Sequence, residues 1–377
     1  MQNYITQIAA VVLLLALARG QTPNPSEAIA LEQQGKLAEA AQAWRAVTRQ
    51  NPRDAGAFAS LGVVLSRQEK YDEAASAYKK AIALNPKLPG VQFNLGLAEF
   101  KQGHLEAALT PLTAAVKSDP ANLQAQTVLG LSLYGTKHFS AAASHLKIAA
   151  NSDAANTELH QVLAQSCLLA KQYDCALEEF RKILEHDPDS AASHVLTGEA
   201  LDGLDKTTDA IAEFQAAVKI APSEPNVHFG LGYLYWKLHQ YDDARREFNN
   251  ELAVDSGNAQ AVAYLGDIEM KQDHTEQALA LLTKSTQMQN DLRIAWLDMG
   301  AIFARQKKFG DALSAFERAV KLDPSQPDAH YRLAQLYKDT GNAAESQEEL
   351  AKVRELHQKA DDAVASRMSP PKPVTPQ

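Results

Sequence analysis

The chain contains two cysteines, Cys167 and Cys175, whose thiols are close enough in sequence to form a covalent bond. Seven residues lie between them. If each thiol belongs to one helix of a helical hairpin, a disulfide could join the two helices, and such a bridge suits an exported protein. The same residues could instead be small thiols buried on apolar faces. The sequence leaves both interpretations open, because it does not give the separation of the two Cα atoms.

The other residues that can do chemistry do not form a catalytic pattern. The sequence has no G-x-S-x-G motif, no Gly-rich phosphate loop and no H-E-x-x-H motif. The eleven histidines are scattered, and His138, His145, His186 and His194 are typical of surface or packing residues rather than metal ligands. We therefore predict a protein that is not an enzyme and that holds no metal and no cofactor.

The elements that carry these residues are predicted to be paired helices. In residues 55–88, Phe58 and Leu65 fall on one face of a first helix, and the second half of the segment repeats the helical spacing. Residues 68–70 are too few for anything but a tight turn. Pro86 ends the second helix, because proline lacks a backbone N–H. This hairpin has apolar surface on both sides and cannot bury it alone.

The same hairpin recurs every 34 residues. Three columns of residues keep this register without an insertion. A proline follows the second helix at Pro52, Pro86, Pro120, Pro188, Pro222 and Pro324. Very small residues stand in the first helix at Ala28, Gly62, Gly96, Gly130, Ala164, Gly198, Gly232, Gly266, Gly300 and Ala334. Large apolar residues stand in the second helix at Trp44, Tyr78, Leu112, Leu146, Phe180, Phe214, Phe248, Leu282, Phe316 and Leu350. A fixed period of this length predicts a solenoid, with small residues meeting where the two helices cross.

These columns resemble the tetratricopeptide repeat family over residues 21–350, which correspond to ten 34-residue units. The resemblance implies an all-α fold, a right-handed superhelical α-solenoid whose first helices line a concave groove. It also implies binding of a protein or peptide, with no chemistry of the solenoid's own. Ala154, Ser256 and Asn290 replace the proline, so the turns there form without it. A further column of the second helix is alanine, from Ala40 and Ala74 to Ala312, and Ser346 departs from it, which indicates a capping unit.

The resemblance also predicts which first-helix residues face the groove. We expect two apolar zones that could seat side chains of a bound peptide, formed by Phe93, Leu97, Phe100 and Tyr134, and by Phe229, Tyr233, Trp236 and Met270. The alternative is that these aromatic residues pack on the neighbouring unit. Between the zones the groove positions are polar, at Glu158, Gln161, Gln165, Glu199 and Asp202. Some members of the family clamp a peptide carboxylate with Lys and Asn, but this sequence has no Lys at the matching positions.

The N-terminal segment predicts export. Residues 8–18 are an unbroken apolar run, too short for a typical membrane span and followed by small residues. We interpret residues 1–20 as a secretory signal peptide, which places the mature protein in the periplasm or outside the cell with no membrane span. The alternative is an uncleaved anchor, since the first seven residues lack Lys and Arg.

The remaining features concern charge and the C-terminal end. A net charge of −9 argues against nucleic acid as a partner, because the basic surface that such binding needs is missing. Residues 343–367 predict a long capping helix, and residues 368–377 predict a Pro-rich disordered tail.

Together these features predict a non-catalytic scaffold that binds a protein or peptide partner. The resemblance to exported members of the family implies a setting in assembly or maintenance of the cell envelope. Two alternatives remain: a structural adaptor that self-associates, and a non-catalytic subunit of an enzyme complex. The sequence identifies neither the partner nor the oligomeric state.

Overall fold

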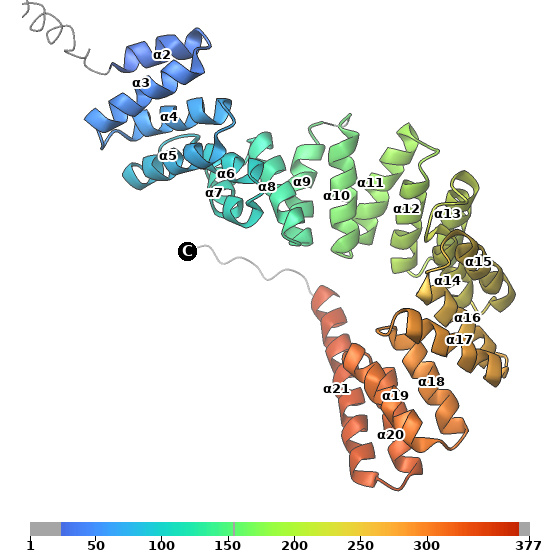
Figure 1. Ribbon diagram of the computed structural model, residues 1–377. Helices are drawn as coiled ribbons and strands as arrows, with labels where there is room; N and C mark the ends of the chain where they lie inside the picture. The colour runs from blue at the N-terminus through green and yellow to red at the C-terminus, as the bar shows by residue number, and fades with distance from the viewer. Residues whose placement is uncertain (1–23, 154, 369–377) are drawn as a thin grey trace, which may run out of the picture. The chain divides into compact units, whose positions relative to one another are not determined.

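The computed structural model describes residues 24–153 and 155–368, so the expected signal at 1–20 and residues 369–377 of the expected tail lie outside it. In these ranges the chain forms twenty helices, α2 to α21, and no strand (Figure 1). The chain divides into two compact units at Pro188. Each unit is a stack of antiparallel helix pairs, which confirms the predicted all-α solenoid of repeats.

The first unit contains five helix pairs. Their bounds are α2 (Pro25–Gln33) with α3 (Leu37–Gln50), α4 (Ala55–Arg67) with α5 (Tyr71–Leu84), α6 (Val91–Lys101) with α7 (Leu105–Ser118), α8 (Leu123–Gly135) with α9 (Phe139–Ala150), and α10 (Thr157–Leu169) with α11 (Tyr173–His186).

The second unit also contains five pairs. Their bounds are α12 (Ala191–Gly203) with α13 (Thr207–Ile220), α14 (Val227–Lys237) with α15 (Tyr241–Val254), α16 (Ala259–Lys271) with α17 (Thr275–Met288), α18 (Arg293–Arg305) with α19 (Phe309–Leu322), and α20 (Pro327–Asp339) with α21 (Ala343–Met368). The hydroxyl of Ser346 donates to the carbonyl oxygen of Ala334 at 2.8 Å, so the serine that replaces alanine ties the last two helices together.

The turn inside each pair has one residue in the left-handed region of φ. This residue recurs every 34 positions, at Gly35, Glu69, Gly103, Lys137, Lys171, Asp205, His239, Asp273, Lys307 and Gly341. Glycine adopts this conformation without a steric penalty, whereas the other residue types are strained there. The sequence predicts the turn, but only three of its ten positions carry the glycine that would reveal its geometry.

The small column contacts the large column of its own pair as well as the helix crossing. A Cβ atom added at Gly62 would lie 2.4 Å from the Tyr78 ring, and one at Gly198 would lie 2.6 Å from the Phe214 ring. The large side chain therefore lies over the glycine of its own pair. Alanine in the facing helix column, such as Ala74 and Ala210, is fully buried beside this contact.

Five of the ten first helices begin with a polar cap of one kind. The side chain accepts a hydrogen bond from the backbone N–H three residues later at Asp54, Asn122, Asn156, Ser190 and Asn258. The helices α6 and α14 begin differently, because Gly90 and Asn226 follow a proline and adopt positive φ. These two helices consequently begin two residues later in their repeats than α4 and α8 do. In α14 this later start shapes the pocket described next.

Candidate functional site

A pocket of about 730 Å³ lies between the first helices α12 and α14 of the second unit. Its apolar wall includes Val195 and Leu196 from α12 and Phe229 and Tyr233 from α14, with Phe214 of α13 also in the lining. Two residues of the predicted groove, Phe229 and Tyr233, are thus brought together here. A concave, mostly apolar pocket of this size is the usual form of a binding site.

The rim of this α12–α14 pocket is acidic. Glu199, Asp202 and Glu224 belong to its lining, and no basic residue does. Asp202 is paired with Lys237 at 2.8 Å. Partial burial of the Glu199 carboxyl raises its pKa above the usual value. Glu199 and Asp202 are among the positions that the sequence marked only as polar, and the structure places them beside the apolar residues.

A buried carboxylate holds the loop that closes one side of this pocket. Glu251 of α15 is fully buried and accepts hydrogen bonds from the backbone N–H groups of Asn226, at 2.8 Å, and Phe229, at 3.0 Å. Its side chain therefore caps α14 in place of a local capping residue. Asn258 donates to the same carboxylate at 3.1 Å. This cap fixes the position of Phe229 and of the loop before it.

Trp236, the third aromatic residue of the predicted zone, packs toward the following pair. Its ring meets that of Tyr264 at 5.0 Å between centroids and stacks on Tyr233 at 5.8 Å. Its Nε1 atom donates to a carboxylate oxygen of Asp267, and the Lys271 ammonium lies 5.5 Å from the ring. Trp236 is half-buried in this cluster and is not part of the lining of the α12–α14 pocket.

Two carboxyl groups meet beneath this cluster. Asp298 is buried, and burial together with the neighbouring Asp267 raises its pKa well above the usual range. Asp267 is also buried and accepts a hydrogen bond from Lys271 at 2.7 Å. Burial likewise raises the pKa of the adjacent Tyr264 hydroxyl. The first helices α16 and α18 thus carry two buried carboxyl groups, and the pKa of the one on Asp298 is raised well above its usual range.

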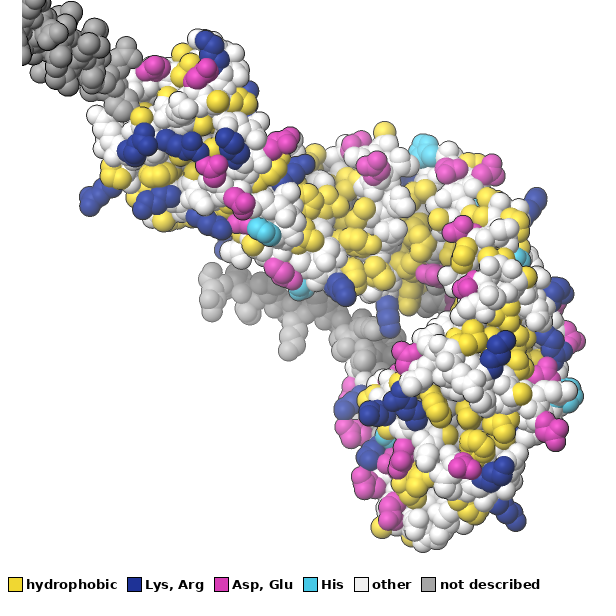
Figure 2. Space-filling model, in the orientation of Figure 1, with side chains coloured by type: hydrophobic (Ala, Val, Ile, Leu, Met, Phe, Trp, Pro, Cys, Tyr) yellow, Lys and Arg dark blue, Asp and Glu magenta, His cyan; other side chains and the backbone are white. Residues whose placement is uncertain are grey.

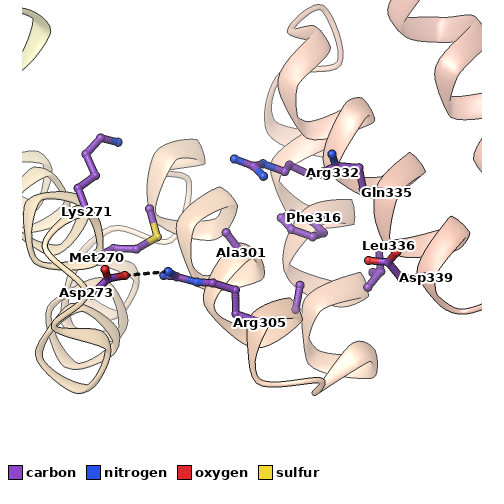
Figure 3. A pocket seen from close by; sticks show the side chains of 11 residues that line it. Met270, Lys271, Asp273, Ala301, Arg305, Phe316, Arg332, Gln335, Leu336 and Asp339 are labelled. Atoms are coloured by element: carbon purple, nitrogen blue, oxygen red, sulfur yellow. Dashed lines mark hydrogen bonds and ion pairs between the residues drawn. The ribbon is translucent and has the colours of Figure 1, made fainter.

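A second pocket of this unit, of about 570 Å³, is lined by α16, α18, α19 and α20 (Figure 3). It includes the predicted Met270 and differs in charge from the first, because Lys271, Arg305 and Arg332 belong to its lining. Arg305 pairs with Asp273 at 3.3 Å. Arg332 extends from α20 toward the side of α16 that carries Lys271, as Figure 3 shows.

The first unit has its own apolar pocket, of about 560 Å³, formed by α6, α8 and α10. It brings together the predicted Phe93 and Leu97 with Val128 and Leu131, and its only charged lining residues are acidic, Asp153 and Glu158. Figure 2 shows hydrophobic side chains gathered over α9 to α11 of this unit on the face in view.

Two predicted groove residues of the first unit have other partners. Phe100 packs against the core cluster that contains Leu112 and Leu129. The hydroxyl of Tyr134 donates to the side-chain oxygen of Gln165 at 3.0 Å. Neither residue belongs to the lining of the α6–α10 pocket.

The two cysteines lie on α10 and α11 of one pair. Their sulfur atoms are bonded in the structure, and their Cα atoms are 5.8 Å apart. Cys167 is fully buried. In the described ranges, no cluster of His, Cys, Asp or Glu has the geometry of a metal site, and no helix is long and apolar enough to span a membrane.

Sequence reasoning missed three residues that shape the α12–α14 pocket. Gly230 leaves space beside Phe214, Glu251 caps α14, and Tyr264 closes the adjacent position of the next pair. The sequence offered one signal for Gly230. The equivalent position of other repeats carries a larger residue, at Val128, Val162, Leu196 and Tyr264. Nothing in the sequence pattern marked Glu251.

Family models described as tetratricopeptide repeats match residues 26–89 and 229–291, and 65–131 and 303–367. A further model, described as a TPR repeat, matches residues 204–238. Together these matches cover more than half of the chain and lie in both units.

Curated relatives match over shorter stretches. The chain is 26% identical over 144 residues to the BBSome complex member bbs-4 of Caenorhabditis elegans, a match that covers 36% of this chain and 29% of the worm protein. It is 26% identical over 136 residues to the type IV pilus assembly protein PilF of Pseudomonas aeruginosa, over 35% of this chain and 54% of that protein. The chain thus spans about half of the pilus protein and less of the worm protein.

Solved structures match the chain at low identity and with TM-scores below 0.5. A C-terminal part of a TPR repeat-containing protein from Cytophaga hutchinsonii has a TM-score of 0.44 at 20% identity, over 64% of this chain and 98% of that one. YrrB, described as a TPR protein with an unusual peptide-binding site, has a TM-score of 0.36 at 22% identity, over 52% of this chain and 100% of its own. The repeat register and the family matches agree, and the chain belongs to the tetratricopeptide repeat family.

Proposed function

We propose that this chain is an exported, non-catalytic scaffold whose first helices bind a segment of a partner protein. The observation that carries the proposal is the α12–α14 pocket, where apolar side chains including Phe229 and Tyr233 surround about 730 Å³ of open space. A solenoid does not need such space for its own packing, because neighbouring pairs normally fill the gap between them. Burial of an apolar side chain from a partner would remove this surface from water.

Two further observations support the setting. The apolar run at residues 8–18 has the pattern of a secretory signal. One of the matched relatives is a type IV pilus assembly protein. We therefore place the function at the cell envelope, in the assembly or maintenance of a larger structure.

The experiment is a comparison of partner capture by wild-type protein and two charge variants at the same repeat position. Val195→Glu puts a carboxylate into the α12–α14 pocket, whereas Gln161→Glu changes an exposed residue that lines neither apolar pocket. Proteins retained by the wild type in its native host are identified by mass spectrometry. We expect one partner to be retained by Gln161→Glu and lost from Val195→Glu. Equal retention by both variants would contradict a binding role for this pocket.

The alternative function, self-association through an end of the solenoid, has one observation in its favour. Tyr331 on α20 and Leu350 on α21 are large apolar residues that remain 46% and 39% exposed in the last pair. Such residues could contact a second copy. Mass measurement in solution decides this point, and a monomer at all accessible concentrations would exclude the adaptor.

A further inference from the structure

The charges around the α12–α14 pocket specify more than an apolar ligand. Its lining contains three carboxylates and no basic group. Lys237 neutralises Asp202, but Glu199 has no hydrogen bond or ion pair in the described part of the chain. The pocket therefore combines an apolar wall with a negative charge that the protein leaves uncompensated. An uncompensated charge beside a binding surface favours a ligand group of opposite sign.

We infer that the α12–α14 pocket receives an apolar side chain of the partner that is adjacent to a Lys or Arg in the partner's sequence. This inference rests on the proposed function and names the chemistry of the bound segment. The apolar side chain would lie against Val195, Leu196 and Phe229, and the neighbouring cation would pair with Glu199. Desolvation raises the pKa of the Glu199 carboxyl in the free protein, and a bound cation would favour its ionised form.

Gly230 makes this pocket different from other positions of the solenoid. A Cβ atom there would lie 2.1 Å from the Phe214 ring, so only glycine leaves the ring uncovered. In the next pair the same register holds Tyr264, whose ring lies 5.8 Å from that of Phe229. Aromatic packing therefore replaces open space one repeat later. In the second unit the apolar wall and the carboxylates Glu199, Asp202 and Glu224 therefore lie in the same pocket.

The pocket shown in Figure 3 provides a contrast within the same unit. Its lining includes three basic residues, Lys271, Arg305 and Arg332, and two acidic ones, Asp273 and Asp339. Lys271 and Arg305 are paired with carboxylates, whereas Arg332 makes no ion pair among the described residues. A peptide with basic residues around its apolar anchor would meet the unpaired Arg332 in that pocket, whereas Glu199 would attract it in the α12–α14 pocket. Charge thus directs such a segment to the α12–α14 end of the unit.

The test uses three synthetic peptides of ten residues that each contain one central Phe, flanked by Lys, by Gln or by Glu. Binding to the full chain is measured by fluorescence anisotropy at low and high salt. We expect the Lys-flanked peptide to bind at least about fivefold more tightly than the Glu-flanked one, with a difference that shrinks as salt increases. Equal binding of the Lys- and Glu-flanked peptides, or binding of none of the three, would overturn the inference.

Two variants assign the effect to the pocket. Glu199→Gln should lower affinity for the Lys-flanked peptide about two- to fivefold and leave the Gln-flanked peptide unaffected. Val195→Phe should lower the affinity for every peptide that binds at least about tenfold, because the new ring fills the pocket. Gln161→Phe, at the equivalent position of another repeat, should leave the affinity unchanged. Phe occurs naturally at this register in Phe93 and Phe229, so both variants are compatible with the fold.

The outcome is separable from that of the proposed function. If the partner captured in the native host is lost from Val195→Glu but Glu199→Gln does not alter the peptide preference, the scaffold stands and the charge inference fails. If peptides show the predicted preference but no partner depends on the pocket, the proposed function fails instead.

Discussion

The Nδ1 atom of His228 on α14 lies 2.7 Å from the Oε2 atom of Glu247 on α15, and both side chains are buried. The same contact, nineteen residues apart, joins the first helix to the second in three other pairs, at His160–Glu179, His194–Glu213 and His330–Glu349. It is thus a repeating polar link inside a helix pair. Burial acts to raise the pKa of the Glu349 carboxyl, but hydrogen bonds from Lys352 and His330 outweigh this effect and lower the pKa.

One pair contains the same link with the residue types changed. Gln126 stands at the histidine position and donates to the carbonyl oxygen of Pro120 at 2.9 Å, while its side-chain oxygen is bonded to His145 at the glutamate position. His228 similarly bonds through Nε2 to the carbonyl oxygen of Pro222 at 3.1 Å. The two forms are therefore alternative solutions to one geometric requirement: a donor to the loop and a bond to the second helix.

The first prediction exchanges these forms. His228→Gln alone should lower stability by about 1–3 kcal/mol, because a buried partner of Glu247 is lost. The double variant His228→Gln, Glu247→His copies the Gln126–His145 form and should recover most of that loss. Hydrogen exchange of amides in α14 and α15 reports the local stability. A double variant as unstable as the two single changes combined would show that the forms are not equivalent.

The second prediction concerns the turn inside each pair. Lys137 has a φ of 63°, a conformation that costs a side chain about 1 kcal/mol relative to glycine. Lys137→Gly should therefore raise the free energy of unfolding by up to that amount, measured by urea denaturation. Gly103→Lys, at the same register, is the matched control and should lower it. No change in either variant would show that the turn relaxes without strain.

The third prediction follows from the raised pKa of Asp298. A carboxyl whose pKa is higher in the folded state contributes stability at low pH, and this contribution is lost as pH rises through the folded pKa. Asp298→Asn cannot ionise, so the variant should be more stable than the wild type at neutral pH, by more than about 1 kcal/mol. The groups that face Asp298 include Asp267, Lys271 and Arg332.

Thermal midpoints measured from pH 4 to pH 9 test this prediction. The wild-type midpoint should fall toward the alkaline end relative to that of Asp298→Asn, and the two curves should converge at acidic pH. A variant that is less stable than the wild type at every pH would show that the carboxyl contributes through its packing or hydrogen bond rather than through its titration.

The fourth prediction concerns Cys167 and Cys175. We expect the exported protein to carry a disulfide between α10 and α11, so its intact mass should rise by about 2 Da on reduction, one hydrogen per sulfur. Cys175→Ser should lower stability by about 2 kcal/mol, since the bridge closes a short loop in the unfolded chain. Alkylation of both thiols without reductant in protein purified from the exported fraction would contradict the bridge.

The sequence predicted the helix pairs and their register because each column of small, large or proline residues reports one repeated contact. It did not predict the local geometry of the turn at Lys137, because a non-glycine residue gives no sign of a positive φ. Nor could it separate Phe229 from Trp236. Both occupy first-helix positions and both contact the Tyr264 ring, and only the three-dimensional packing shows that Phe229 also lines open space whereas Trp236 does not.

The polar residues of the candidate site were hidden for a related reason. Glu199 reads as a solvated position when it is considered on its own helix, and it joins the pocket only through the apolar residues of α14 that lie opposite. Glu251 acts across the pair on the backbone of Asn226. Contacts of this kind depend on three-dimensional distance and leave no periodic pattern in a single chain.

The central claim is that the first helices form the binding surface, and photo-crosslinking tests it most directly. A benzoyl-phenylalanine is introduced at Leu196 in the α12–α14 pocket, or at the exposed Lys219 of the second helix α13, and the protein is irradiated in its native host. The account predicts a covalent adduct with one partner protein from position 196 and none from position 219. Adducts from position 219 alone would contradict it.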